Sequence, residues 1–217
     1  MKSKESADER RRRYIGRMMP WLPVLTVVIR VFGPAIDLYV RLFRPQQHRY
    51  YALTKLAWRA YAEGRDSEAE TLCHEVLDLA ERVPRDWNYG NAVHDGNQIL
   101  GLVSLRRGDV ESAKAFLLAA GATPGSPQLD SFGPEMVLAR ELLVRGESGV
   151  VLSYLDLVAG FWTKHKPYLR EQPWHHKLKR ETQKRIGRWK AEIHARKVPT
   201  GDNWEAKPWE RRPRRRW

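Results

Sequence analysis

The 217-residue chain has few features of the common enzyme classes or of secreted proteins. Its only cysteine is Cys73, so an intramolecular disulfide cannot form and nothing indicates an oxidising compartment. It has no glycine-rich phosphate-binding loop and none of the H-E-x-x-H, C-x-x-C and G-x-S-x-G patterns. The one histidine pair, His175–His176, consists of helix neighbours about 100° apart, which rarely bind one metal ion together. We therefore expect no catalytic site, no cofactor and no metal site, and we expect Cys73 to be a buried apolar residue.

A continuous membrane-spanning run is also missing. Residues 18–45 are mostly apolar, but three prolines together with Arg30 and Asp37 interrupt the run of about 20 residues that a spanning helix needs. A secretory signal peptide is disfavoured because no convincing cleavage site follows the apolar part. Two interpretations remain. The segment either enters the membrane as a shallow hairpin or interfacial helix, or it packs on protein as a capping or partner-docking helix.

Basic residues lie on both sides of this apolar segment. Arg10–Arg13 and Arg17 precede it, and Arg41, Arg44 and Arg49 lie at its end. The positive-inside tendency would keep both flanks in the cytoplasm, so we expect the chain on the cytoplasmic side of a membrane, or otherwise in the cytoplasm. The residues expected to contact lipid or a docking partner are Trp21, Leu22, Leu25, Val28, Phe32, Leu38, Leu42 and Phe43.

Charge is distributed unevenly along the chain, whose formal net charge is +13. Residues 1–49, which begin with a basic leader over 1–17, carry 11 basic and 4 acidic side chains. Residues 50–163 carry 10 basic and 16 acidic side chains, and residues 164–217 carry 18 and 6. A mildly acidic centre between two basic ends indicates that the ends meet an anionic partner, which is a lipid surface, nucleic acid or an acidic protein face.

Residues 91–124 have the pattern of two short amphipathic helices joined by a tight turn. Gly108 can supply the left-handed residue that ends the first helix, and Asp109 is placed to cap the second. Gly101 and Ala113 are small residues at the positions where two antiparallel helices would cross most closely. The stretch therefore predicts a helix hairpin.

This hairpin resembles the tetratricopeptide repeat (TPR), a helix–turn–helix unit of 34 residues. The resemblance rests on Leu100-Gly101, Gly108-Asp109 and Ala113, with Pro124 near the end of the unit. The run over 126–136 is also similar to a group of uncharacterised bacterial TPR-like proteins, and that similarity implies no activity. TPR-like proteins bind protein partners, so the resemblance implies a class of function without naming the partner.

Weaker copies of the same pattern surround Gly64 and Gly146. They predict an all-α fold in which residues 50–163 form a short TPR-like α-solenoid of about three helix hairpins. Ser67 and Glu70 have the spacing of a capping box for the second helix. Residues 123–134 are rich in proline and glycine and are expected to form a loop.

Beyond the repeats, residues 164–198 predict a basic helix with a narrow apolar stripe made of Leu178, Ile186, Trp189 and Ile193. Residues 199–217 form a tail rich in tryptophan and arginine without helical periodicity. We expect this tail to become ordered only by contact with another molecule, although it could instead fold back over the acidic repeats.

These features predict a non-enzymatic scaffold, assembly factor or protein-interaction subunit that binds a protein partner and attaches to a membrane or membrane complex. The alternative is a nucleic-acid-binding protein that uses its basic C-terminal third. Trp87 and Tyr89 have a second interpretation, in which they fill the gap left by an insertion between repeats. The predicted partner-binding residues are Tyr61, Trp87, Tyr89, Asn97, Trp204, Trp209, Arg211, Arg212 and Trp217.

Overall fold

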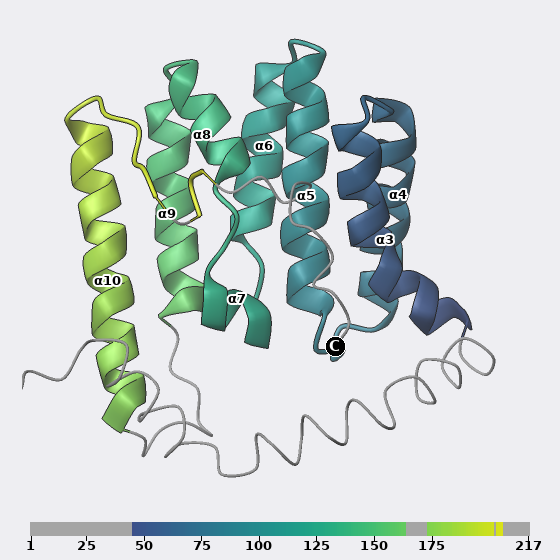
Figure 1. Cartoon of the computed structure of the whole chain (residues 1–217), viewed down its shortest axis with the longest axis horizontal. Helices are drawn as coiled ribbons and strands as arrows, with labels where there is room; N and C mark the ends of the chain where they lie inside the picture. Colours follow the sequence, from purple (N-terminus) through teal and green to yellow (C-terminus); the bar gives the residue numbers. More distant parts are fainter. Residues whose placement is uncertain (1–44, 164–172, 202, 206–217) are drawn as a thin grey trace, which may run out of the picture. The chain divides into compact units, whose positions relative to one another are not determined.

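The computed structural model describes residues 45–163, 173–201 and 203–205, and these form eight helices and no strand (Figure 1). One compact unit begins at Arg49. The predicted docking residues within 18–43 lie outside the described residues. So do the tail residues Trp209, Arg211, Arg212 and Trp217. The all-α fold class is confirmed for the described part of the chain.

Six of the helices form three sequence-adjacent pairs, each joined by a tight turn. In every turn a glycine has the left-handed conformation that other residues avoid: φ is 74° at Gly64, 80° at Gly108 and 87° at Gly146. Asp109 caps the helix that follows it, because its side chain accepts a hydrogen bond from the Ser112 amide. The pairs are α3 (Pro45–Ala62) with α4 (Asp66–Arg82), α5 (Tyr89–Arg106) with α6 (Val110–Gly121), and α8 (Val137–Val144) with α9 (Ser148–Trp162).

Two local predictions are wrong. Residues 123–134 are not all loop, because α7 (Pro127–Phe132) begins there with Ser126 as a capping residue and Pro127 in the first turn. The capping box at Ser67 does not form, because α4 already begins at Asp66 and its N-cap residue, Arg65, makes no side-chain capping bond.

The last helix is α10 (Pro173–His194), which packs against α9. The predicted stripe is confirmed for Ile186, Trp189 and Ile193, which are buried. Leu178 is 45% exposed and does not belong to it. The Trp189 ring stacks on Trp162 of α9 with ring centroids 6.2 Å apart, which fixes the middle of α10 on the core.

The centre of the fold is α5, which is buried on nearly all sides and contacts α4, α6, α7 and α8. The sequence predicts one apolar face for this helix, and the structure instead covers its polar residues as well. Gly101 allows close packing, but the neighbour that needs the space is Leu138 of α8 and not the paired helix α6. Leu56 of α3 is exposed, whereas Cys73 is fully buried as predicted.

Two glycines at the same helical position provide a test of this packing. Gly90 is the second residue of α5, and a Cβ atom there would overlap the carbonyl oxygen of Gly125. We expect Gly90→Ala to lower the free energy of unfolding by about 1–3 kcal/mol, the usual cost of overpacking, because backbone cannot move aside cheaply.

The matched control is Gly149→Ala at the second residue of α9, where a Cβ atom would meet nothing within 4 Å. Here the greater helix propensity of alanine should leave stability unchanged or raise it by up to about 1 kcal/mol. Urea denaturation of the full chain measures both variants. Equal stability of the two would contradict the close approach at Gly90.

Candidate functional site

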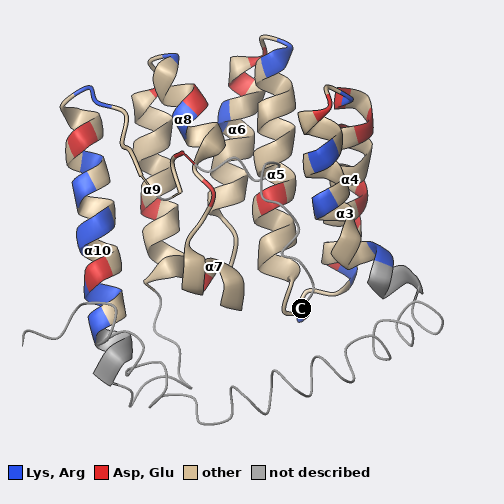
Figure 2. Cartoon of the chain, in the orientation of Figure 1, with Lys and Arg blue, Asp and Glu red and all other residues tan. Residues whose placement is uncertain are grey.

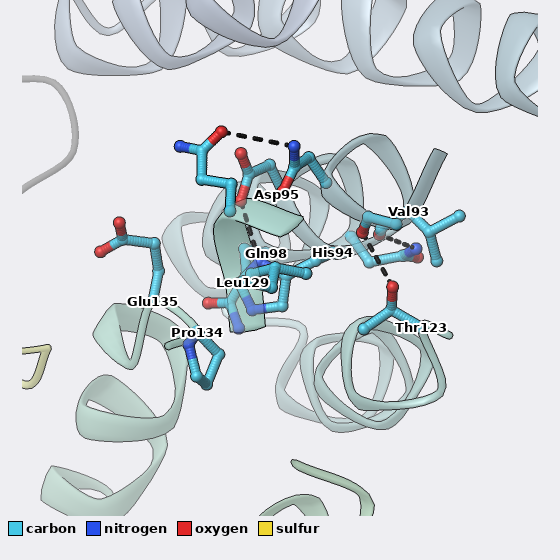
Figure 3. Close-up of polar contacts among 12 residues, drawn as sticks. Val93, His94, Asp95, Gln98, Thr123, Leu129, Pro134 and Glu135 are labelled. Carbon is cyan, nitrogen blue, oxygen red and sulfur yellow. Dashed lines mark hydrogen bonds and ion pairs between the residues drawn. The ribbon is translucent and has the colours of Figure 1, made fainter. Parts of the chain in front are cut away.

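A stripe of buried polar side chains runs along α5. Asn88 precedes the helix, and Asn91, His94 and Gln98 follow it at intervals of three or four residues, which places them on one face. All four are buried, and segments outside α5 supply partners to Asn91, His94 and Gln98. Figure 3 shows His94 and Gln98 among the polar contacts. Unpaired polar groups in such a place would be costly, so their hydrogen bonds decide what packs against α5.

The C-terminal half of this stripe is organised by the Tyr154 hydroxyl from α9. It lies 3.2 Å from His94 Nε2, accepts a hydrogen bond from Gln98 Nε2 at 3.3 Å and donates to the Glu135 carbonyl at 3.2 Å. His94 Nδ1 lies 2.8 Å from an Asp95 carboxylate oxygen. If the ring is neutral and donates from Nδ1, its Nε2 is an acceptor and shares the single hydroxyl proton of Tyr154 with Glu135.

Gln98 also completes the start of α8. Its Oε1 accepts a hydrogen bond from the Leu138 amide at 3.3 Å, and Leu138 is the second residue of that helix. Amides in the first turn of a helix have no partner within the helix, and the N-cap residue Met136 supplies none from its side chain. Gln98 therefore acts as a cap delivered from a different helix.

The N-terminal half of the stripe binds the connector between α6 and α7. Asn91 Nδ2 donates to Asn88 at 3.0 Å and to Gln128 at 3.3 Å, and its Oδ1 accepts from the Ser126 hydroxyl at 2.6 Å. The Thr123 hydroxyl donates to the Gly90 carbonyl at 2.8 Å (Figure 3). These bonds hold the connector against the helix at the point where Gly90 allows the two backbones to meet.

The chemistry available to this cluster is limited by its burial. His94 and Tyr154 have no exposed surface, and burial raises the pKa of the Tyr154 hydroxyl above its ordinary value, so the phenol stays protonated at neutral pH. Burial also raises the pKa of the Cys73 thiol, which keeps it in the unreactive thiol form. Within residues 45–163, 173–201 and 203–205, no group of three or more His, Cys, Asp or Glu residues could hold a metal ion. The hydrogen bonds of the cluster therefore serve to hold the helices in position.

Most of the predicted partner-binding residues that the structure describes are buried. The Tyr61 ring lies under the Arg106 guanidinium, whose central carbon is 3.5 Å from the ring centroid. Asn97 is buried and its side-chain amide donates to the Val93 carbonyl at 2.7 Å. Tyr89 is half-buried and packs against the core cluster around Leu53, which agrees with the gap-filling interpretation. Tyr61 and Asn97 are therefore covered by the fold, and Tyr89 is partly covered.

The expectation that Trp204 is ordered only by another molecule is wrong. Its side chain is 1% exposed and meets Trp189 edge-on, with ring centroids 5.7 Å apart. Asn203 holds the segment in place, because its side-chain amide donates to the Pro134 carbonyl at 2.6 Å and its own carbonyl accepts from the Met136 amide. The start of the tail therefore folds back over α10 and the residues that precede α8.

Among the predicted binding residues that the structure describes, Trp87 is the most accessible, with 56% of its surface exposed. Its ring lies 5.5 Å from that of Tyr51 on α3, and the Tyr51 hydroxyl donates to Asp86 at 2.8 Å. Val83, at the end of α4, is also exposed. We call Tyr51 and Trp87 the α3–α4 aromatic patch.

Sequence reasoning missed Tyr154, Ser126 and Gln98 as members of the polar cluster. A usable signal was present: Asn91, His94 and Gln98 have helical spacing in a helix whose later residues are mostly apolar, which indicates a buried polar contact. Their partners lie 35–60 residues away in sequence, so the identity of those partners needed the structure.

No protein-family model matches the chain, and the comparisons with curated proteins and with solved structures give no match either. In the part of the chain that the structure describes, no helix combines the length and the apolar character needed to cross a membrane.

Tyr154→Phe tests the central hydroxyl of the cluster. The substitution keeps the ring but removes the partner of His94, Gln98 and the Glu135 carbonyl, so buried polar groups lose their hydrogen bonds. We expect the free energy of unfolding to fall by about 1–3 kcal/mol.

Tyr51→Phe is the matched control, because it removes a hydroxyl that donates to Asp86 at an exposed site. Its effect should stay within about 0.5 kcal/mol. Thermal or urea unfolding of the full chain compares the two variants. A Tyr154→Phe protein as stable as Tyr51→Phe would show that the hydroxyl does not organise the cluster.

Proposed function

We propose that this protein is a non-enzymatic scaffold or assembly subunit whose helical repeats resemble the TPR and bind a protein partner. The observation that carries the proposal is the repeated turn: three helix pairs end their first helix with a left-handed glycine at Gly64, Gly108 and Gly146. Repeated helix pairs of this kind stack by burying their apolar faces against their neighbours, and their function is usually partner binding.

The partner surface we propose is the α3–α4 aromatic patch. Trp87 and Tyr51 are held next to each other, and Asp86 fixes the Tyr51 hydroxyl, so the two rings are already ordered before a partner arrives. Ordered aromatic side chains are favoured anchors in protein interfaces because they bury a large area at a small entropic cost. Tyr61 and Asn97 are not part of this proposal, since the fold covers them.

We also propose that residues 18–43 attach the protein to the cytoplasmic side of a membrane or to a membrane complex. The support is the basic–apolar–basic order of the sequence before α3. That segment leads directly into α3, whose exposed Tyr51 belongs to the proposed partner surface.

The alternative is a nucleic-acid-binding protein that uses the basic C-terminal third. Its charge is suited to phosphate contacts. Two of its tryptophans, Trp189 and Trp204, are buried against each other, and Trp189 also stacks on Trp162, so they are not available for stacking on bases. This alternative therefore has less support than the scaffold.

Cell fractionation tests the attachment. The full chain should sediment with membranes and be released by detergent, whereas a chain that starts at Pro45 and keeps all of α3 should be soluble. High salt alone should not release the full chain, because apolar insertion resists screening. If the full and shortened chains are equally soluble without detergent, residues 18–43 do not attach the protein to a membrane.

A further inference from the structure

The outer face of α10 carries a row of basic side chains. Lys177, Arg180, Lys184 and Arg188 recur at intervals of three or four residues, so they share one stripe of the helix. The buried residues Thr182, Ile186, Trp189 and Ile193 occupy the opposite stripe, which faces the core. We call the four basic residues the α10 cationic stripe. Figure 2 shows the basic residues along this helix.

Two other cations of α10 have contacts within the fold. Lys190 pairs with Asp156 of α9, and the Arg185 guanidinium lies 5.6 Å from the centroid of the Trp162 ring. Among the described residues, Lys184 and Arg188 of the stripe pair with acids of their own helix, Glu181 at 3.3 Å and Glu192 at 3.8 Å. Their side chains are still 74% and 62% exposed, so they are available to a partner.

The stripe costs stability in the isolated protein. Arg180, Lys184 and Arg188 are like charges at successive i, i+4 positions, which destabilise a helix. Residues 177–197 hold nine basic side chains against two acidic ones, so Glu181 and Glu192 offset only part of this charge. An external anion would remove this repulsion.

We propose that the α10 cationic stripe binds the phosphate-bearing head groups of an anionic membrane surface. The stripe follows one side of a straight helix for about 16 Å, a geometry that suits a flat array of charges. Four to eight Lys or Arg residues on a helix are typical of segments that bind anionic lipid. The nearby Trp189 and Trp204 are buried, which favours contacts to head groups over contacts to bases.

The inference rests on the proposed attachment through residues 18–43 and adds a second contact to it. Stable membrane association commonly needs two such signals, one apolar and one electrostatic. The two contacts respond differently to lipid charge. Binding to neutral vesicles measures the contribution of the apolar segment. The additional binding to anionic vesicles measures the contribution of the electrostatic contacts.

The test is vesicle flotation of the full chain, with vesicles of phosphatidylcholine alone and of phosphatidylcholine mixed with phosphatidylglycerol. One variant changes the stripe: Lys177→Gln, Arg180→Gln, Lys184→Gln and Arg188→Gln. The control variant removes the same number of exposed charges elsewhere: Lys55→Gln, Arg82→Gln, Arg85→Gln and Arg140→Gln. Circular dichroism of both variants confirms that α10 and the rest of the fold remain.

We expect the stripe variant to bind the anionic vesicles about tenfold or more weakly than the unaltered chain, with unchanged binding to neutral vesicles. The control variant should lose much less. Equal losses in the two variants would show that only total charge matters, and unchanged binding by the stripe variant would show no role for the stripe. Either result overturns the proposal.

Fluorescence anisotropy of a labelled RNA oligonucleotide measures RNA binding by the same variants. If the stripe variant loses RNA binding and keeps vesicle binding, the partner is nucleic acid and the lipid proposal is overturned. Failure of the attachment through residues 18–43 can be told apart from failure of the stripe proposal. In the first case the unaltered chain would bind no neutral vesicles, but its binding to anionic vesicles would still test the α10 cationic stripe.

Discussion

The rest of the described fold depends on the burial of a polar face of α5. Asn91, His94 and Gln98 lose contact with water there, and each has to find its hydrogen-bond partners in other segments. Apolar contacts alone would allow the neighbouring segments to slide, whereas these bonds accept only particular partners at particular positions. The polar face therefore fixes which residues of the connector and of α9 lie against α5, and it supplies the start of α8 with a cap.

Because these polar groups are used inside the fold, they are not available to a partner, and binding has to use other surfaces. Tyr61 and Asn97 are covered, and Trp204 closes the core next to Trp189. The α3–α4 aromatic patch and the α10 cationic stripe remain exposed, and they differ in chemistry: the first offers ordered rings and the second offers charge. A scaffold that holds a protein at a membrane needs both kinds of contact, and the two surfaces lie on different helices.

Local chemistry made the helix pairs predictable. Gly64, Gly108 and Gly146 each stand between the end of one helical pattern and the start of the next. A glycine in that position indicates a left-handed turn whatever surrounds it. The helix α7 was missed because proline and glycine dominate its surroundings, although Ser126-Pro127 is itself a helix-start signature. The polar cluster and the burial of Trp204 depend on contacts between residues far apart in sequence, such as Gln98 with Leu138 and Asn203 with Pro134. Periodicity within one segment does not encode such contacts.

The claim that most needs testing is that this protein binds a protein partner through the α3–α4 aromatic patch. The measurement is quantitative co-purification of the full chain from its own cells in mild detergent, with Trp87→Ala compared with Phe132→Ala. Phe132 is the matched control because it is an exposed aromatic residue, 67% exposed, on α7. We predict that specific partners of the unaltered chain are retained by Phe132→Ala and reduced about tenfold or more by Trp87→Ala. Equal recovery of the same partners with both variants would contradict the account.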